Sequence, residues 1–403
     1  VDASNGNGAL TYPVGLITAD EMAYAGGGGF VSNSSIYLYT GYSLWSFSPS
    51  LFNGSNAVGF HLDSDGSLVN YYVTASFGVR PSVSLKPGIK ITGGSGTSTD
   101  PFVVAKPSLY DYIKSNADTT TTIDFSKTSE ASSTNGIYTT TNTDSGKPVY
   151  YYRGNVDNRV IFANFCWRIV RTTETGGVKL IYDGVPSNGQ CNNTGDNSTI
   201  GSSAFNPSKD NAKYVGYMYG SSIDDTTYTD DSTIKKKIDT WYKTKMTSYT
   251  SQLEDTVFCN DRSYTTSGSA LYFGAYNRIR TNKTPTLKCQ NAKDKFTVDA
   301  SNGNGALTYP VGLITADEMA YAGGVYGSSN KNSSFYLYTG EYYWSFSPWR
   351  FLGSYAYGSA PGSDGVLAGY IVDRSIGVRP SVSLKPGIGM TGSGTATDPF
   401  VIG

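Results

Sequence analysis

The chain contains one segment twice, and the two copies are identical in two blocks. Residues 1–27 recur without a single change as residues 298–324. Further along each copy, residues 78–89 recur without change as residues 377–388. A fold built from this chain must therefore use the same framework twice.

Between the identical blocks lies a window in which the copies differ. Comparing residues 42–77 with residues 341–376, 19 positions differ and 17 agree. Drift after a duplication would scatter changes, and exposed polar segments such as SNGNG would change first. The confinement of substitution to one window favours targeted diversification of a binding surface. Drift shaped by selection is the alternative.

The varied residues also have an unusual composition. Of the two residues at each varied position, all but Glu341 and Trp349 are amino acids with a codon ending in C, and Lys, Gln and Met are absent. Randomising both adenines of the asparagine codon AAC gives this set, whereas ordinary surfaces are rich in Lys, Gln and Glu. We predict that the varied positions bind ligand, the main candidates being Glu341, Tyr342, Tyr343, Trp349, Arg350, Leu352, Tyr355, Tyr357, Ser359, Ala368, Ile371, Asp373 and Arg374 in the second copy, and Tyr42, Ser43, Leu44, Ser50, Leu51, Asn53 and Asn56 in the first.

Composition limits the classes of partner. The 403 residues predict two or more domains, or one large domain with extensions. Charged residues make up 16% and the net charge is −1, so no excess of positive charge can neutralise phosphates, and we expect no nucleic-acid partner. No apolar run approaches the ~20 residues that span a bilayer, and no signal peptide opens the chain. Because residue 1 lies inside a repeated unit, we expect a fragment or processed form, with any anchor or export signal outside it.

All four cysteines lie in the unrepeated middle of the chain. An even number in a charge-poor, Thr- and Tyr-rich chain predicts disulfides and an extracellular or cell-surface location. Spacing favours Cys166–Cys191 and Cys259–Cys289, although four cysteines allow three connectivities. Buried free thiols remain an alternative. A zinc site is disfavoured because C-x-x-C spacing and accompanying histidines are absent.

The order of motifs predicts three parts. Residues 1–105 are a first copy of a variable half-domain, and residues 106–134 read as a polar linker. Residues 135–403 contain the motifs of one full α+β domain with mixed or antiparallel sheets and two helices. The first copy lacks the upstream half, so we expect it to form part of a domain or to borrow strands from another chain.

Local patterns place the main elements of the full domain. Residues 148–185 alternate apolar runs with Gly, Asn and Asp turns and predict strands, and residues 377–385 predict a strand beside them. Residues 232–246 predict a helix capped by Ser232. A second helix is expected at 315–322, where T-x-x-E is a capping box.

The end of the window shows strand-like alternation of fixed and varied residues. Leu367, Tyr370, Val372 and Ser375 are shared between copies, whereas their neighbours vary. Successive strand side chains point to opposite faces, so fixed residues can pack inward while much of the varied set faces outward. We expect the fixed Trp45 and Trp344 to support the framework rather than to contact ligand.

These motifs resemble a known family. A fixed W-S-x-S-P, a varied stretch and a closing G-V-R-P strand resemble the variable proteins of diversity-generating retroelements. The longer pattern of NGIYTTTNTDSGKPVYYYRG, FCWRIVR, GYMYG, FCNDRS, LTYPVGLITADE and DPFVI is similar to secreted surface proteins of gut Firmicutes. Over residues 135–403 the resemblance implies a C-type lectin fold related to formylglycine-generating enzymes. It also implies that adenine-directed reverse transcription rewrites the window.

Some features depart from that pattern. Neither copy has the E-P-N, Q-P-D or W-N-D tokens of calcium-dependent sugar-binding lectins, and D-S-D-G at 63–66 becomes G-S-D-G, so a turn is preferred to a calcium loop. We expect no metal and no cofactor. Loops of unequal length at 28–35 and 325–334 require insertion or deletion, which substitution alone does not produce.

Three functional readings follow. We expect an extracellular receptor- or adhesin-like protein that binds an unknown protein or glycan, because the varied set is rich in the Tyr, Trp and Arg typical of binding hot spots. The alternative is a structural repeat or pilus-like stalk with antigenic variation, whose partners are further copies of the 297-residue repeat. An enzyme is least favoured, because the only histidine, His61, is replaced by Ala360 in the second copy.

Overall fold

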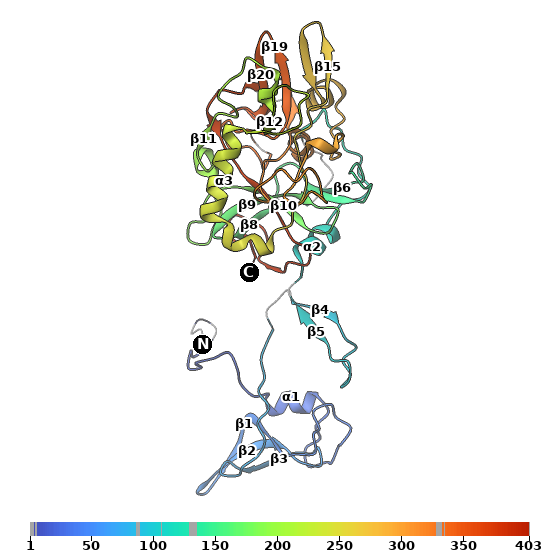
Figure 1. Ribbon diagram of the computed structural model, residues 1–403. Helices are drawn as coiled ribbons and strands as arrows, with labels where there is room; N and C mark the ends of the chain where they lie inside the picture. The colour runs from blue at the N-terminus through green and yellow to red at the C-terminus, as the bar shows by residue number, and fades with distance from the viewer. Residues whose placement is uncertain are drawn as a thin grey trace. The chain divides into compact units, whose positions relative to one another are not determined.

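The computed structural model describes residues 4, 6–85, 89–105, 107–128, 135–327, 333 and 335–402. The chain divides into two compact units, Val1–Ile89 and Lys90–Gly403, which we describe separately as unit 1 and unit 2 (Figure 1). Strands predominate over helices in the described residues, and the chain belongs to the α+β class, as the sequence predicts.

Unit 2 is organised around an eight-stranded sheet with the order β23-β10-β9-β8-β25-β24, to which β7 adds by pairing with β9 and β6 by pairing with β7. All these pairs are antiparallel except β8 with β25. Every residue of β7 and β10 is buried, which explains why these strands read as apolar runs. The predicted strands at 148–185 and 377–385 are confirmed. The bounds are β6 (Ile137–Thr140), β7 (Val149–Tyr152), β8 (Arg159–Phe162), β9 (Phe165–Thr172), β10 (Val178–Tyr182), β23 (Ser381–Leu384), β24 (Met390–Thr391) and β25 (Phe400–Ile402).

A second, six-stranded sheet in unit 2 contains the varied window. Its order is β15-β16-β19-β20-β21-β18, and all neighbours are antiparallel except β18 with β21. Gly353 and Ser354 connect β19 to β20 with φ angles of 56° and 66°, the left-handed pair that a tight type I′ hairpin requires. The strands are β15 (Tyr264–Ser267), β16 (Ala270–Phe273), β18 (Val325–Tyr326), β19 (Pro348–Leu352), β20 (Tyr355–Pro361) and β21 (Val366–Ile371).

Both helices predicted for the full domain are confirmed. In α3 (Thr233–Lys245) the Ser232 side chain accepts a hydrogen bond from the Lys235 amide. In α5 (Ala316–Ala322) Thr315 and Glu318 form the capping box. The other helical segments are α2 (Leu109–Ser115), α4 (Gly274–Tyr276), the π-helix η5 (Asn277–Asn282) and the 3₁₀ helices η2 (Gly195–Ser198), η3 (Ala212–Val215), η4 (Thr247–Gln252) and η6 (Ala292–Asp294).

Four two-stranded ladders complete the described secondary structure of unit 2. They are β11 (Ser202–Ser203) with β22 (Ile376–Gly377), β12 (Met218–Tyr219) with β13 (Asp230–Asp231), β14 (Phe258–Cys259) with β17 (Lys295–Phe296), and β4 (Lys90–Gly93) with β5 (Val103–Ala105).

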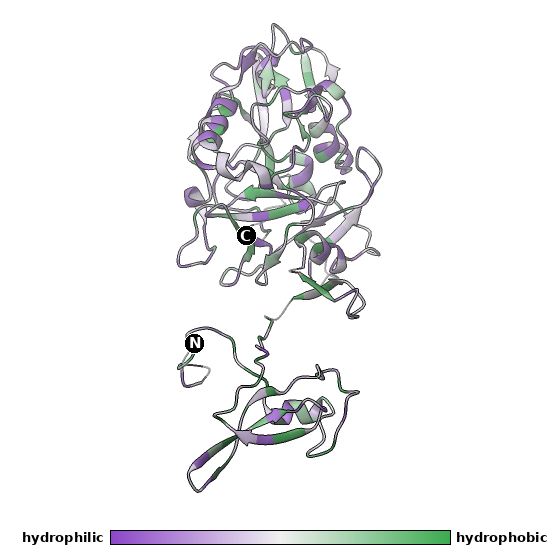
Figure 2. Cartoon of the chain, turned by 60° about the horizontal axis from the view of Figure 1, so that its bottom comes forward, coloured by the Kyte–Doolittle hydropathy of each residue, from purple (hydrophilic) through white to green (hydrophobic). Residues whose placement is uncertain are grey.

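A single large core fills unit 2. Trp167 and Ile169 of β9, Leu180 of β10 and Phe346 are all less than 2% exposed and belong to one continuous cluster. In Figure 2 the strands inside the unit are largely hydrophobic, whereas the helices at its surface carry many hydrophilic residues. Burial of both the middle segment and the second copy in one core explains why the full domain needs both parts.

The prediction of a polar linker at 106–134 is wrong for most of its length. Helix α2 buries Leu109 and Ile113 in the core of unit 2, and Phe125 packs edge-to-face against Tyr321 at 4.9 Å. The Leu109 amide also donates to the carbonyl of Ile388. The Thr- and Ser-rich composition of the stretch concealed its few apolar anchors. Residues 106 and 129–134 lie outside the described residues.

Both predicted disulfides are confirmed. Cys166 of β9 pairs with Cys191, and Cys259 of β14 pairs with Cys289, across 25 and 30 residues of sequence. Loops of this length typically contribute about 3 kcal/mol by restricting the unfolded chain. Two disulfides are consistent with a secreted protein.

Unit 1 has a much smaller core. Helix α1 (Ala19–Tyr24) packs on an antiparallel sheet with the order β1-β2-β3. The buried apolar residues of that core are Ala19, Met22, Ile36, Leu62 and Leu68, and the strands are β1 (Leu44–Asn53), β2 (Asn56–Leu62) and β3 (Leu68–Tyr72). Unit 1 therefore contains the fold of the second copy without the strands that surround that copy in unit 2.

The burial of α2 gives a direct test of the domain boundary. Ile113→Ala is expected to lower the free energy of unfolding of unit 2 by about 2–5 kcal/mol, because the side chain is 0% exposed within the core. Lys114→Ala, at the exposed neighbouring position, is the matched control and is expected to stay within about 0.5 kcal/mol. Chemical denaturation measures both free energies of unfolding. Equal effects of the two substitutions would indicate that α2 belongs to a linker and not to the core of unit 2.

Candidate functional site

The varied window of unit 2 folds so that most fixed and most varied side chains of β19–β21 lie on opposite faces of one sheet. Exceptions include Ala360 and Ala368, which vary on the fixed face, and Leu367, which is fixed on the varied face. Phe351 lies opposite Ala356, and Gly358 opposite Tyr370, in the register of β19, β20 and β21. These four residues, and Val372 beyond β21, are the same in both copies. Their strand neighbours on the other face all vary, which is the alternation predicted from the sequence.

Most fixed side chains pack inward. Trp344, Phe346, Leu367 and Val372 are buried, as expected, and Tyr370 is half-buried. A Cβ placed on Gly358 would lie 3.1 Å from the Trp344 ring, so the fixed glycine allows the fixed tryptophan to pack under the sheet. The Trp344 indole N–H also donates to the carbonyl of Ser203 at 2.9 Å. Trp344 therefore supports the framework.

The opposite face carries a continuous group of varied side chains. Cross-strand register places Leu352 opposite Tyr355, Arg350 opposite Tyr357, and Tyr357 opposite Ile371. Asp373 follows Ile371 by two residues and so continues the same face. We call this group the outer patch, and it consists of Arg350, Leu352, Tyr355, Tyr357, Ile371 and Asp373. None of the six is buried, and Figure 1 shows the β19–β20 hairpin at one extremity of unit 2.

Contacts order the side chains of the outer patch. The Arg350 guanidinium lies 4.5 Å from the centre of the Tyr357 ring, a cation–π arrangement. The Lys209 ammonium is 2.6 Å from the Asp373 carboxylate and 5.3 Å from the centre of the Tyr355 ring. The ion pair with Asp373 raises the pKa of Lys209. Two aromatic rings, two cations and one carboxylate thus meet on one exposed surface.

Lys209 and Tyr272 were not predicted from the sequence. Lys209 reaches the outer patch from the segment before η3, and Tyr272 lies opposite Arg350 across β16 and β19. Neither lies in the repeated part of the chain, so the comparison of copies carries no signal for them. Only the fold brings them to the varied face.

The prediction of exposed varied residues is wrong at seven positions of the second copy, which are the candidates Tyr343, Trp349 and Ser359 and the further varied residues Ala360, Pro361, Gly362 and Val366. Tyr343 is 1% exposed because the Arg379 guanidinium covers its ring and its hydroxyl donates to the carbonyl of Leu337. Trp349 is 2% exposed beneath Tyr276 and Tyr326. The third candidate, Ser359, is 0% exposed, and its hydroxyl has no hydrogen-bond partner in the described residues.

The remaining candidates of the second copy lie outside the outer patch. Glu341 and Arg374 are exposed, whereas Ala368 is half-buried. Tyr342 is also half-buried, packed edge-to-face against Tyr370 at 4.9 Å. The varied set therefore contains exposed, partly covered and fully buried members.

The first-copy candidates are mostly exposed. Tyr42, Leu51, Asn53 and Asn56 are exposed, and Ser43 and Ser50 are half-buried. Leu44 is buried at 7% exposure, so the expectation of an exposed binding residue is wrong there. Its side chain closes on Gly78, where an added Cβ would lie only 2.8 Å from a Leu44 methyl group.

Some varied residues contact one another and have changed as pairs. In unit 1 the Asn70 amide donates to the Ser50 hydroxyl at 3.0 Å. Their counterparts are Gly369 and Trp349, and a Cβ on Gly369 would lie 2.1 Å from the Trp349 ring. A large side chain at one position thus accompanies glycine at the other. This is compensation between neighbours in contact, which recognition of a ligand does not require.

The D-S-D-G segment of unit 1 behaves as a turn. Asp63 accepts hydrogen bonds from Ser43 and the Ser64 amide, and Asp65 accepts them from Ser32 and Ser67. These bonds lower the pKa of both carboxyl groups. Among the described residues no group of three or more His, Cys, Asp or Glu side chains is placed to hold a metal ion.

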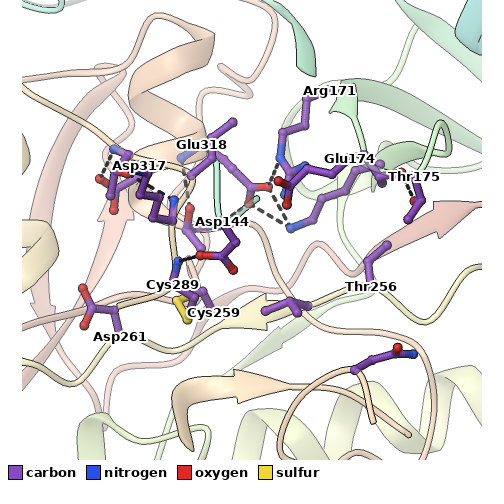
Figure 3. A pocket seen from close by; sticks show the side chains of 18 of the residues that line it. Asp144, Arg171, Glu174, Thr175, Thr256, Cys259, Asp261, Cys289, Asp317 and Glu318 are labelled. Atoms are coloured by element: carbon purple, nitrogen blue, oxygen red, sulfur yellow. Dashed lines mark hydrogen bonds and ion pairs between the residues drawn. A yellow bond between two sulfur atoms is a disulfide. The ribbon is translucent and has the colours of Figure 1, made fainter. Parts of the chain in front are cut away.

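A polar pocket of about 220 Å³ lies elsewhere in unit 2, beside the Cys259–Cys289 disulfide (Figure 3). Glu318 of the α5 capping box receives hydrogen bonds from Lys179 and Arg171, each at 2.8 Å. Arg278 binds both oxygens of Asp317, also at 2.8 Å. Sequence patterns did not indicate this group, because its members come from distant segments.

Two cations neutralise the Glu318 carboxylate in the pocket. Burial alone would raise the pKa of Glu318, but Lys179 and Arg171 outweigh it and hold the pKa at about 2. Burial lowers the pKa of Lys179 to about 8, although the Glu318 carboxylate opposes that shift. Because Glu318 pairs with Arg171 of β9 and Lys179 of β10, we interpret these groups as a structural network that fixes the second copy to the two strands (Glu318 and Arg171 are labelled in Figure 3).

No known protein family, curated protein or solved structure matched this chain in the comparisons. Within the described residues, no helix is both long and apolar enough to span a membrane.

The paired change at Trp349 and Gly369 can be tested by a double-mutant cycle. Gly369→Asn alone is expected to destabilise unit 2 by about 1–3 kcal/mol, because the new side chain meets the Trp349 ring. Adding Trp349→Ser recreates the pair of unit 1 and is expected to recover part of that loss. Denaturant unfolding of the four proteins gives a coupling energy, and simple additivity would refute the compensation.

Proposed function

We propose that this protein is an extracellular ligand-binding protein in which the outer patch of unit 2 recognises a protein or glycan. The observation that supports the proposal most is the division of the β19–β21 hairpin region by face. Every member of the outer patch differs between the copies. On the opposite face Phe351, Ala356, Gly358, Tyr370 and Val372 are shared, whereas Ala360 and Ala368 vary.

The chemistry of the outer patch favours recognition. Tyr355 and Tyr357 provide large contact areas with few rotatable bonds, and Arg350 can pair with carboxylates or stack on rings. Such residues dominate the binding energy of many protein interfaces. Tyr355 is 42% exposed and Leu352 37% exposed, so these side chains are accessible at the hairpin tip.

The scaffold is suited to repeated substitution. Trp344 and its neighbours bury the fixed face, and two disulfides restrain the surrounding segments. Changes on the exposed face of such a sheet usually alter stability by less than about 0.5 kcal/mol. The proposal includes the finer identity drawn from the motifs, a C-type-lectin-like variable protein of a diversity-generating retroelement at the cell surface. A reverse transcriptase gene and a template repeat beside the gene would support that origin.

The repeat or stalk reading predicts a different arrangement. Antigenic variation alone would place varied residues over unrelated surfaces, or bury them between successive copies of the repeat. The clustering of six varied side chains on one face of one sheet supports recognition instead.

The binding test begins with arrays of glycans and of secreted and cell-surface proteins, probed with the full chain. For any probe that binds, Tyr355→Ala with Tyr357→Ala is expected to weaken the affinity by about 30-fold or more, as for truncated hot spots. Tyr264→Ala is the matched control, because Tyr264 is similarly exposed at 37% on β15 outside the window.

A grafted variant tests the same proposal without assuming any one probe. Replacing the outer patch by its counterparts from the first copy is expected to change the set of bound probes while the unfolding free energy stays nearly constant. An unchanged set of probes, or an equal loss of affinity in Tyr264→Ala, would contradict the proposal. The substitutions are Arg350→Leu, Leu352→Asn, Tyr355→Asn, Tyr357→Val, Ile371→Tyr and Asp373→Thr.

A further inference from the structure

Identical residues have opposite environments in the two copies. Tyr24 is 93% exposed, whereas its counterpart Tyr321 is 4% exposed, and Leu85 is 60% exposed against 0% for Leu384. The same contrast, exposed in unit 1 and buried in unit 2, holds for Leu10 and Leu307, Val14 and Val311, Phe47 and Phe346, Val79 and Val378, and Val83 and Val382. Since the sequences are the same, the difference lies in what covers them.

In unit 2 the cover is a strand of the preceding segment. Strand β23 pairs with β10 over its whole length, with Leu384 opposite Val178 and Val382 opposite Leu180. On its other side, Ser381 forms a bridge with Gly312. Unit 1 retains the equivalent bridge between Ser82 and Gly15. The segment of unit 1 that matches β23 is thus held from one side, while Val83 and Leu85 stay exposed.

The arginine that the two copies share also has fewer hydrogen-bond partners in unit 1 than in unit 2. Arg379 donates to the carbonyls of Leu337 and Tyr182 and to the Asp183 carboxylate. Its counterpart Arg80 donates to the carbonyl of Leu38, the equivalent of Leu337.

Glu21 repeats the pattern at the helix. It keeps the capping-box bonds to Thr18 that Glu318 makes to Thr315. Glu318 is additionally bound by Lys179 and Arg171, whereas Glu21 is exposed. The hydrogen bonds of Arg379 and Glu318 within the copy are thus preserved in unit 1. Their partners outside the copy all belong to residues 107–297 and are Arg171, Lys179, Tyr182 and Asp183.

We propose that unit 1 is a docking surface for a further segment with the sequence character of residues 107–297, which we call a first half. This inference is independent of the proposed ligand-binding function. The first half would pair its counterpart of β10 with residues 82–85, cover Tyr24, and place its lysine and arginine on Glu21.

Stoichiometry favours that occupant over a second copy of the chain. Each chain holds one first half and two copies of the segment that binds it, and in unit 2 the first half is already engaged by residues 298–402. When such chains associate with one another, even by exchanging their first halves, one repeated segment per chain remains without a first half to cover it. A separate first half would cover that remaining segment.

The test compares the full chain with an extended chain that carries a copy of residues 107–297 joined ahead of Val1. Hydrogen exchange at residues 82–85 is expected to slow by about a thousand-fold or more on extension, from that of a frayed segment to that of a core strand. Residues 381–384 are the internal reference and are expected to be slow in both proteins. Because residues 78–89 and 377–388 are identical, each peptide must include a flanking residue that differs, either Phe77 or Lys90 for the first copy and either Ile376 or Gly389 for the second.

Matched variants at the helix identify the interface. Gln is tolerated in a capping box, so Glu21→Gln and Glu318→Gln remove mainly the ion pairs. Glu318→Gln is expected to speed hydrogen exchange at residues 381–384 of the second copy about tenfold or more, both in the original chain and in the extended chain. Glu21→Gln is expected to act only in the extended chain.

Three outcomes would overturn the inference. The first is rapid hydrogen exchange at residues 82–85 in the extended chain. This outcome counts against the inference even if mass mapping shows that the cysteines of the added segment have not formed their two disulfides. Slow exchange at 82–85 in the original chain would show that the surface is covered without a further first half. Dependence of that protection on protein concentration would assign the cover to a second copy.

Discussion

The pairing of β23 with β10 is the contact on which the rest of unit 2 depends. It joins the second copy to the middle of the chain, and each of its register pairs is buried. The Glu318 network beside it fixes α5 to β9 and β10, and Arg379 ties the same copy to Asp183. Where this pairing is lacking, in unit 1, the same sequence exposes Val83, Leu85 and Tyr24.

A domain held together by these contacts can tolerate substitutions on the outward face of β19–β21. The varied strands β19–β21 attach to the core through Trp344, Val372 and their fixed neighbours, and their other face is open at the hairpin tip. Nearer the core, the varied face is covered by Tyr276 and Tyr326, and there substitutions must fit. The pair Trp349 and Gly369 shows such a fit, whereas the outer patch carries no comparable restriction.

The sequence predicted the parts of the fold that depend on local patterns. Apolar runs located β7 to β10, the Ser232 N-cap located α3, the capping box located α5, and spacing paired the cysteines correctly. It failed at α2, whose buried Leu109 and Ile113 stand in a polar stretch. It also failed at Tyr343, Trp349 and Ser359, because comparison of copies detects variation but not the cover that distant segments provide. Comparison of the copies also could not find Lys209, which contacts Asp373 and Tyr355 of the outer patch but lies outside the repeated part of the chain.

The central claim is that one face of the β19–β21 sheet is free to vary while the other specifies the fold. Saturation substitution of residues 341–376, with protease resistance of the displayed protein as the measure of folding, tests it most directly. We expect most substitutions to be tolerated at the six positions of the outer patch and few at the buried Ala356, Gly358 and Val372, since buried positions lose about 1–5 kcal/mol when altered. Equal intolerance on both faces would contradict the claim.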